Sequence, residues 1–109
     1  MVARRVFPDP KDQQLREMYL AVVRRADPRA YRRAMTALGL FDSRKRLHEI
    51  QAPTLVVTGA DDSTVSPARQ KLLAQDIPWS RQVIIQNAGH AVSVDQAEQF
   101  NQALVEFLL

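Results

Sequence analysis

The sequence predicts an α/β fold in which a helical segment, residues 1–50, precedes a β-α-β-α unit with two parallel strands, residues 51–109. Three observations predict it. Apolar residues recur at three- and four-residue steps in the first half, which is typical of helices. Two short runs rich in β-branched residues lie in the second half, separated by a helical pattern. The charge balance also changes near residue 50: the first segment holds 12 basic and 6 acidic side chains, and the second holds 3 and 6.

Two helices are predicted in the first half, each preceded by an aspartate and a proline. Asp9-Pro10 and Asp27-Pro28 combine a side chain that caps free N–H groups with a residue suited to the first helical turn. Each signal is followed by an apolar stripe that predicts one buried helix face. The stripes are Leu15, Met18, Tyr19, Val22, Val23 and Ala26, and then Ala30, Tyr31, Ala34, Met35 and Leu38.

The ends of these helices indicate how they are joined. Gly39 is placed to end the second helix at its C′ position. Asp42-Ser43 is placed to cap a short third helix that runs to about Glu49. The connection between the first two helices is short, so we expect them to form a helical hairpin.

The second half is predicted to alternate strands with helices. Residues 54–58 are typical of a strand buried on both faces of a parallel sheet, and residues 82–86 form the second strand. Ser66-Pro67 caps the helix between them. Its inward face holds Ala68, Leu72 and Leu73, followed by Ile77. A last helix begins at about residue 95, with one apolar face of Ala97, Phe100, Leu104, Phe107 and Leu108. Strands joined through a helix are parallel.

Composition excludes several kinds of site. With 109 residues the chain is one domain at most, and it has no cysteine, which excludes disulfides, thiolate metal ligands and a cysteine nucleophile. No apolar run reaches the ~20 residues that a membrane-spanning helix needs. Residues 6–10 read Val-Phe-Pro-Asp-Pro where a signal peptide would have its apolar core. These features favour a globular, cytoplasmic protein without a membrane partner.

The basic residues of the first half have two interpretations. Five arginines lie mostly off the apolar stripes: Arg24, Arg25, Arg29, Arg32 and Arg33. A solvated helix face explains them. A helix-turn-helix that reads DNA would need base-reading residues such as asparagine or glutamine, and neither occurs in residues 15–50. We therefore expect no nucleic-acid partner.

Residues that can move protons follow both predicted strands. Gly59-Ala60-Asp61-Asp62 follows the first strand, and Asn87-Ala88-Gly89-His90 follows the second. Reactive groups in parallel sheets gather at the carboxyl ends of the strands, and neighbouring strands lie about 4.8 Å apart, so an acid and an imidazole can meet there. A carboxylate on one ring nitrogen would fix the tautomer and leave the other nitrogen free as a general base.

The stretch from Ile50 to Leu109 resembles the C-terminal end of an α/β-hydrolase, through its Gly-x-x-Asp turn and its Gly-His pair. That family carries a catalytic triad in the chain order Ser, Asp or Glu, His. The resemblance implies that Asp62 is the acid and His90 the base, with Asp61 a lesser candidate for the acid.

The same resemblance extends in weaker form over the whole chain. Residues 1–50 resemble the end of the helical cap, or lid, and residues 51–109 resemble the C-terminal β-α-β-α part of the hydrolase core. The implied substrates are small esters or lactones, as in esterases and enol-lactonases. No metal or organic cofactor is implied.

The nucleophile motif of the family is not found in the sequence. It is Gly-x-Ser-x-Gly, and none of the chain's three glycines is followed two places on by serine: Gly39, Gly59 and Gly89. Three serines lie near the expected loops without such a turn: Ser63, Ser66 and Ser93. The resemblance therefore implies a partial fold, a fragment or truncated enzyme that supplies acid and base but no nucleophile and is inactive alone.

Alternatives concern both function and packing. Asp62 and His90 would otherwise be a turn aspartate and a structural histidine, and His48 is expected at the surface. A haloalkane dehalogenase-type hydrolase, with its aspartate nucleophile outside the chain, would use the same acid and base. A remnant without catalysis would be an interaction module. The open sheet edge predicts self-association or pairing with an N-terminal complement. Four residues would line a lid pocket or, as we favour, pack between the cap helices: Met18, Tyr19, Met35 and Phe41.

Overall fold

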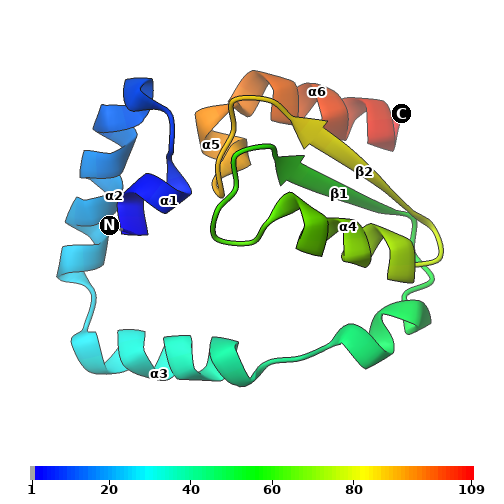
Figure 1. Ribbon diagram of the computed structural model, residues 1–109, viewed down its shortest axis with the longest axis horizontal. Helices are drawn as coiled ribbons and strands as arrows, with labels where there is room; N and C mark the ends of the chain where they lie inside the picture. Colours follow the sequence, from blue (N-terminus) through cyan, green and yellow to red (C-terminus); the bar gives the residue numbers. More distant parts are fainter. Residues whose placement is uncertain (1) are drawn as a thin grey trace.

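The computed structural model describes residues 2–109. The sheet has two strands, and Figure 1 shows it with its helices and a helical arm beside it. The arm comprises α1 (Val2–Val6), the 3-10 helix η1 (Pro10–Asp12), α2 (Gln13–Arg25), α3 (Pro28–Leu40) and the 3-10 helix η2 (Arg44–Glu49). The rest comprises β1 (Thr54–Gly59), α4 (Pro67–Asp76), β2 (Ser80–Ile85), α5 (Val92–Asp95) and α6 (Ala97–Leu108).

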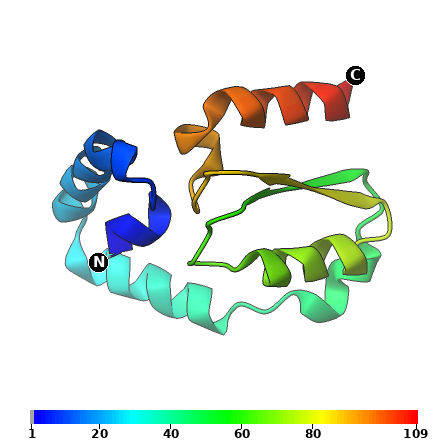
Figure 2. The same cartoon turned by 45° about the horizontal axis from the view of Figure 1, so that its top comes forward.

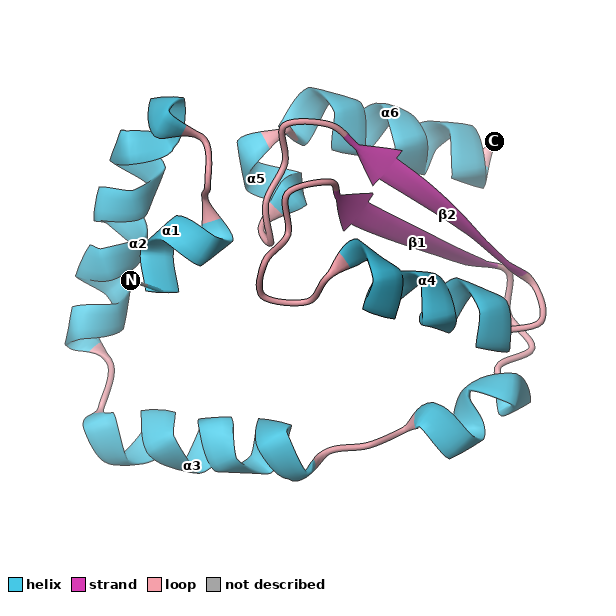
Figure 3. Cartoon of the chain, viewed as in Figure 1, coloured by secondary structure: helices cyan, strands magenta, loops and turns pink. Residues whose placement is uncertain are grey.

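The two strands are parallel, as predicted. Thr54 pairs with Ser80, and the register continues to Gly59 opposite Ile85. Figure 2 shows α4 and α6 on opposite faces of the sheet, and both helices contact it. The loops that leave the carboxyl ends of β1 and β2 lie side by side in Figure 3. Ser66 accepts a hydrogen bond from the Arg69 N–H and caps α4, which confirms the predicted start of that helix.

The sheet is less buried than predicted. Residues 54–57 are half-buried, and full burial begins only at Thr58. The reason is that β1 has one neighbouring strand, so within residues 2–109 its other edge is unpaired. Several residues predicted to face inward are exposed: Ala68, Leu72, Leu73, Leu104 and Leu108. The buried apolar residues are Ala3, Val6 and Phe7 in and after α1, and Leu47, Ile77, Ile85, Ala88 and Ala103 elsewhere.

The predicted helical hairpin does not form. Figures 1 and 2 show α2 and α3 meeting at a corner instead of lying side by side. Ala26 and Asp27 are both extended, with ψ of 145° and 121°. Asp27 precedes a proline, which disfavours helical backbone there, so the chain turns away from α2 before α3 begins.

The apolar stripes of the arm are consequently largely exposed in the described chain. Met18, Val22 and Leu38 are 60%, 71% and 64% exposed, and Met35 and Phe41 are exposed as well. For Met18, Met35 and Phe41, the expectation of packing between the cap helices is therefore wrong within residues 2–109. Tyr19 contacts the buried Phe7 instead, ring edge to face, at a centroid separation of 6.3 Å.

Two further details of the arm differ from prediction. Gly39 lies inside α3, which ends at Leu40, and the described glycines all have negative φ. It therefore does not provide the left-handed turn expected of a C′ glycine. The third helix is a 3-10 helix; at its start the Asp42 side chain accepts the Arg44 N–H at 3.0 Å, as a cap would, whereas the side chain of Ser43 makes no capping hydrogen bond. Among residues 2–109 no helix has the length and apolar character needed to cross a bilayer.

Candidate active site

Asp62 and His90 are in contact where the two strands end. His90 Nδ1 lies 3.0 Å from Asp62 Oδ2. The Asp62 side chain is 4% exposed and that of His90 is 42% exposed. The pair therefore has a buried carboxylate on one side and an imidazole open to solvent on the other. A carboxylate at Nδ1 favours the tautomer with the proton on that nitrogen, which leaves Nε2 as the basic atom of the ring.

The carboxylate of Asp62 accepts from four donors, two at each oxygen. Oδ1 accepts the backbone N–H groups of Thr64 and Val65, at 2.8 and 2.9 Å. Oδ2 accepts from Gln70 Nε2 at 2.9 Å as well as from His90. Burial alone would raise the pKa of Asp62, but the hydrogen bonds from His90, Val65 and Thr64 outweigh it and hold the pKa below its usual value. Asp62 is therefore ionised at neutral pH.

Gly59 lets the two loops approach each other. The backbone N–H groups of Ala60 and Asp61 donate to the carbonyls of Ile85 and Ala88, at 2.9 Å each. A Cβ on Gly59 would overlap the carbonyl oxygens of Gly89 and Ala88. Only glycine fits such a close passage of backbone past backbone. The contact between acid and imidazole therefore depends on this glycine as well as on the parallel register.

The N-terminal segment holds the His90 loop from the other side. The carbonyl of Val6 accepts the His90 N–H at 3.0 Å, and a Cβ on Gly89 would overlap that carbonyl and the Pro8 ring. Asp95 Oδ2 accepts the Gly89 N–H at 2.7 Å. The sequence predicts no particular element for residues 2–6 and no role for Asp95. The five-residue α1 is too short for a periodic signal, and its contact with residue 90 is remote in sequence.

The other candidates from the sequence lie outside this contact. Asp61 is exposed, and its carboxylate is not paired with His90, so the lesser candidate for the acid does not occupy the site. His48 is exposed on η2, as expected. Ser66 caps α4, and Ser63 and Ser93 are exposed. Among residues 2–109, no three side chains of the metal-binding types come together in a site for a metal ion.

A small cavity adjoins the pair. Its volume is about 230 Å³, and its lining includes Asp62, Gln70, His90 and Val92. The imidazole of His90 therefore borders a hollow large enough for a small ligand group.

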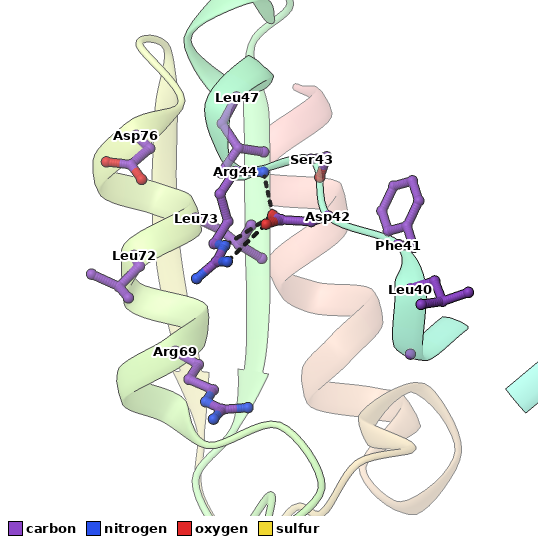
Figure 4. A pocket seen from close by; sticks show the side chains of 11 residues that line it. Leu40, Phe41, Asp42, Ser43, Arg44, Leu47, Arg69, Leu72, Leu73 and Asp76 are labelled. Atoms are coloured by element: carbon purple, nitrogen blue, oxygen red, sulfur yellow. Dashed lines mark hydrogen bonds and ion pairs between the residues drawn. The ribbon is translucent and has the colours of Figure 1, made fainter. Parts of the chain in front are cut away.

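A larger cavity of about 540 Å³ lies elsewhere, between α4 and the segment that joins α3 to η2 (Figure 4). Leu72 and Leu73 line one side, and Leu40 and Phe41 line the other. At its rim the Arg44 guanidinium donates to both carboxylate oxygens of Asp42, which lowers the pKa of that carboxyl to about 2. Because this ion pair is exposed, it contributes little to stability. The cavity contains neither member of the Asp62–His90 pair.

The family of the chain is shown by comparison with known proteins. Residues 24–97, well over half of the chain, match the family model of the alpha/beta hydrolase fold. The chain belongs to this family.

Individual proteins of similar sequence or structure agree with this family assignment. The RutD protein of Agrobacterium fabrum, which carries the name of a carbamate hydrolase, is 39% identical over 77 residues, 71% of this chain and 30% of its own length. The crystal structure of a bromoperoxidase from Bacillus anthracis covers 98% of this chain and 41% of its own, with a TM-score of 0.88 and 29% identity. Est816, titled as an N-acyl homoserine lactone degrading enzyme, covers 96% and 44%, with a TM-score of 0.72 and 28% identity. The chain spans less than half the length of each.

Proposed function

We propose that Asp62 and His90 are the acid and base of a hydrolase that cleaves small esters, lactones or carbamates. The observation that carries this proposal is the 3.0 Å contact between His90 Nδ1 and a buried carboxylate at the carboxyl ends of two parallel strands. Relatives named for carbamates and lactones support the substrate class. In esters, lactones and carbamates alike, the atom that is attacked is a carbonyl carbon bonded to an oxygen or nitrogen leaving group.

The proposed reaction proceeds in two steps. A serine hydroxyl, supplied by a part of the enzyme outside these 109 residues, attacks the carbonyl carbon while His90 Nε2 takes its proton. Asp62 stays ionised and stabilises the imidazolium. Nε2 then gives the proton to the leaving oxygen or nitrogen, and the acyl or carbamoyl group stays on the serine. Water repeats the sequence in the second step: Nε2 takes its proton, the acid product leaves, and the serine regains a proton.

In this proposal the arm is part of the lid, and its exposed apolar faces pack against the remainder of the enzyme. Met18, Val22 and Leu38 carry that inference, because exposed apolar patches of this kind mark contact surfaces. The 109-residue chain alone is expected to self-associate in gel filtration and to show no ester turnover. A clean monomer would contradict the assignment of this surface, and His90-dependent turnover by the chain alone would contradict the need for an outside nucleophile.

A chimaera tests the catalytic assignment. The chain replaces the matching 41% of the Bacillus anthracis protein, whose fold it shares at a TM-score of 0.88. Hydrolysis of p-nitrophenyl acetate is then measured for the chimaera and for its His90→Ala and His48→Ala variants. His90→Ala is expected to lower kcat/KM by a factor on the order of 10³ or more, and the surface control His48→Ala to leave it unchanged. An active chimaera that does not respond to His90→Ala would refute the proposal.

A further inference from the structure

A chain of polar side chains runs from the middle of the sheet to the Asp62–His90 pair. Gln82 on β2 donates to Thr58 Oγ1 on β1 at 2.9 Å. Thr58 donates to Gln70 Oε1 on α4 at 3.0 Å. Gln70 Nε2 in turn donates to Asp62 Oδ2 at 2.9 Å. Thr58 is fully buried, with 0% exposure. Side chains from β2, β1, α4 and the loop after β1 therefore form one line of hydrogen bonds, which ends at Asp62 Oδ2, the oxygen that contacts His90.

The orientation of the Gln70 amide is dictated by its two neighbours. Its nitrogen faces two oxygens that can only accept, Asp62 Oδ2 and the carbonyl of Val65 at 2.8 Å. The amide group has one donor end and one acceptor end, so only the NH₂ end satisfies both contacts. With the opposite orientation, two pairs of acceptors would face each other beside a buried charge, which is costly.

The buried hydroxyl of Thr58 fixes the acceptor end of that amide. Gln70 Oε1 then faces Thr58, whose single hydroxyl proton must point to it. The Thr58 oxygen is left to accept, and it does so from Gln82. Each hydrogen bond in the line therefore fixes the donor and acceptor of the next one, and every donor lies on the side away from the Asp62 carboxylate and donates towards it.

We propose that Gln70 is a positioning residue of the site, directed by Thr58 and Gln82, which holds Asp62 Oδ2 in line with His90 Nδ1. The inference rests on the proposed function for its catalytic meaning, but its geometry does not involve the nucleophile. Without Gln70, Oδ2 would keep only the exposed His90 as a donor, while Oδ1 would keep both backbone N–H groups. The carboxylate would then be free to rotate away from the imidazole.

NMR on the whole 109-residue chain tests this in the unmodified protein first. The side-chain NH₂ protons of Gln70 are expected to shift with pH at the same midpoint as the ¹³Cγ signal of Asp62, because one donates to the titrating oxygen. Those of Gln75, exposed on the same helix, are expected not to follow that midpoint. Gln70 protons that ignore the titration of Asp62 would overturn the inference, whatever any variant shows.

Variants then test the role. Gln70→Met keeps the length of the side chain but removes the hydrogen-bond donor to Asp62 Oδ2, and it is expected to raise the pKa of Asp62 because the ionised carboxylate loses that donor. Gln75→Met makes the same change on the same helix and is expected to have no effect. If Gln70→Met does not fold, two variants at Thr58 test the same role. Thr58→Val removes the hydroxyl that holds the Gln70 amide and is expected to raise the pKa of Asp62. Thr58→Ser keeps a hydroxyl and is expected to leave the pKa of Asp62 at its wild-type value. A folded Gln70→Met or Thr58→Val with an unchanged Asp62 titration would refute the positioning role.

Activity separates this inference from the proposed function. In the chimaera, Gln70→Met is expected to lower kcat about tenfold, because Asp62 then orients His90 less well. An inactive chimaera combined with the predicted titrations would count against the proposed function alone. A His90-dependent chimaera whose kcat ignores Gln70→Met would count against the inference alone.

Discussion

Replacing Asp62 by asparagine removes the charge of the Asp62–His90 pair while keeping the shape of its side chain. The two carboxylate oxygens accept hydrogen bonds from four donors, two at each oxygen. Asparagine has a single side-chain oxygen, so it can accept from only one of these two pairs of donors. If that oxygen stays with the N–H groups of Thr64 and Val65, the new NH₂ group faces Gln70 and His90.

His90 can adapt to this substitution by changing tautomer, so that its ring proton lies on Nε2 instead of Nδ1. With the proton on Nε2, Nδ1 accepts from the asparagine NH₂, and only the Gln70 contact remains donor against donor. Hydrogen bonds to a charged group contribute about 1.5–3 kcal/mol, and a buried donor without a partner costs about 1–3 kcal/mol. We therefore expect Asp62→Asn to lower the free energy of unfolding by about 2 kcal/mol at pH 7. We also expect it to convert His90 to the tautomer that has no basic Nε2.

Urea unfolding and ¹⁵N NMR of the imidazole ring measure these two effects. The matched control is Asp61→Asn, the same change at the exposed neighbouring residue, which is expected to alter neither. If Asp62→Asn left the proton on Nδ1, or left the free energy of unfolding unchanged, the assignment of the carboxylate as the group that sets the tautomer would be wrong.

Three further predictions concern stability. Because the pKa of Asp62 lies below 3.8 in the folded chain, its contribution is present above that value and lost as the pH falls through the folded-state pKa; the wild-type chain and Asp62→Asn should therefore converge in urea unfolding at acid pH. At Asp95, burial raises the pKa, and Oδ1 has no partner among residues 2–109. The burial penalty on the ionised carboxyl is present at pH 7 and is lost as the pH falls below the unfolded-state pKa of aspartate, so the wild-type chain is expected to gain stability relative to Asp95→Asn on acidification; a difference between the two chains that does not change with pH would contradict it. Gly89→Ala forces a Cβ into Val6 and Pro8 and should cost about 1–3 kcal/mol, whereas Gly39→Ala, where the Cβ meets nothing within 4 Å, should gain about 0.5–1 kcal/mol in thermal unfolding. Effects of the same sign at both glycines would contradict that contrast.

The sequence predicts the parts of the fold that depend on local signals. The Asp-Pro and Ser-Pro caps locate the starts of the helices, and two β-branched runs locate the strands. The parallel arrangement follows from the helix between them. Once both strands run the same way, the proximity of Asp62 and His90 follows from the two loops that leave the same edge.

Long-range contacts explain what the sequence could not predict. An apolar stripe that includes Met18 and Val22 indicates that one helix face packs against another surface, but it does not identify that surface. The predicted hairpin was wrong because it assumed that the neighbouring helix provides it. The contact of Val6 with the His90 loop joins residues far apart in the chain. Gln70 and Gln75 look alike in the sequence, and only the fold places one of them against Asp62.

A double-substitution cycle in the chimaera tests most directly whether residues 62 and 90 act as one proton-transferring unit. The values of kcat/KM for Asp62→Asn, for His90→Ala and for the combination are compared with the unaltered chimaera on p-nitrophenyl acetate. If Asp62 works through His90, each single change lowers kcat/KM by a factor on the order of 10³ to 10⁴, and the double variant is no slower than His90→Ala. Losses that multiply in the double variant would show two independent contributions and contradict the account.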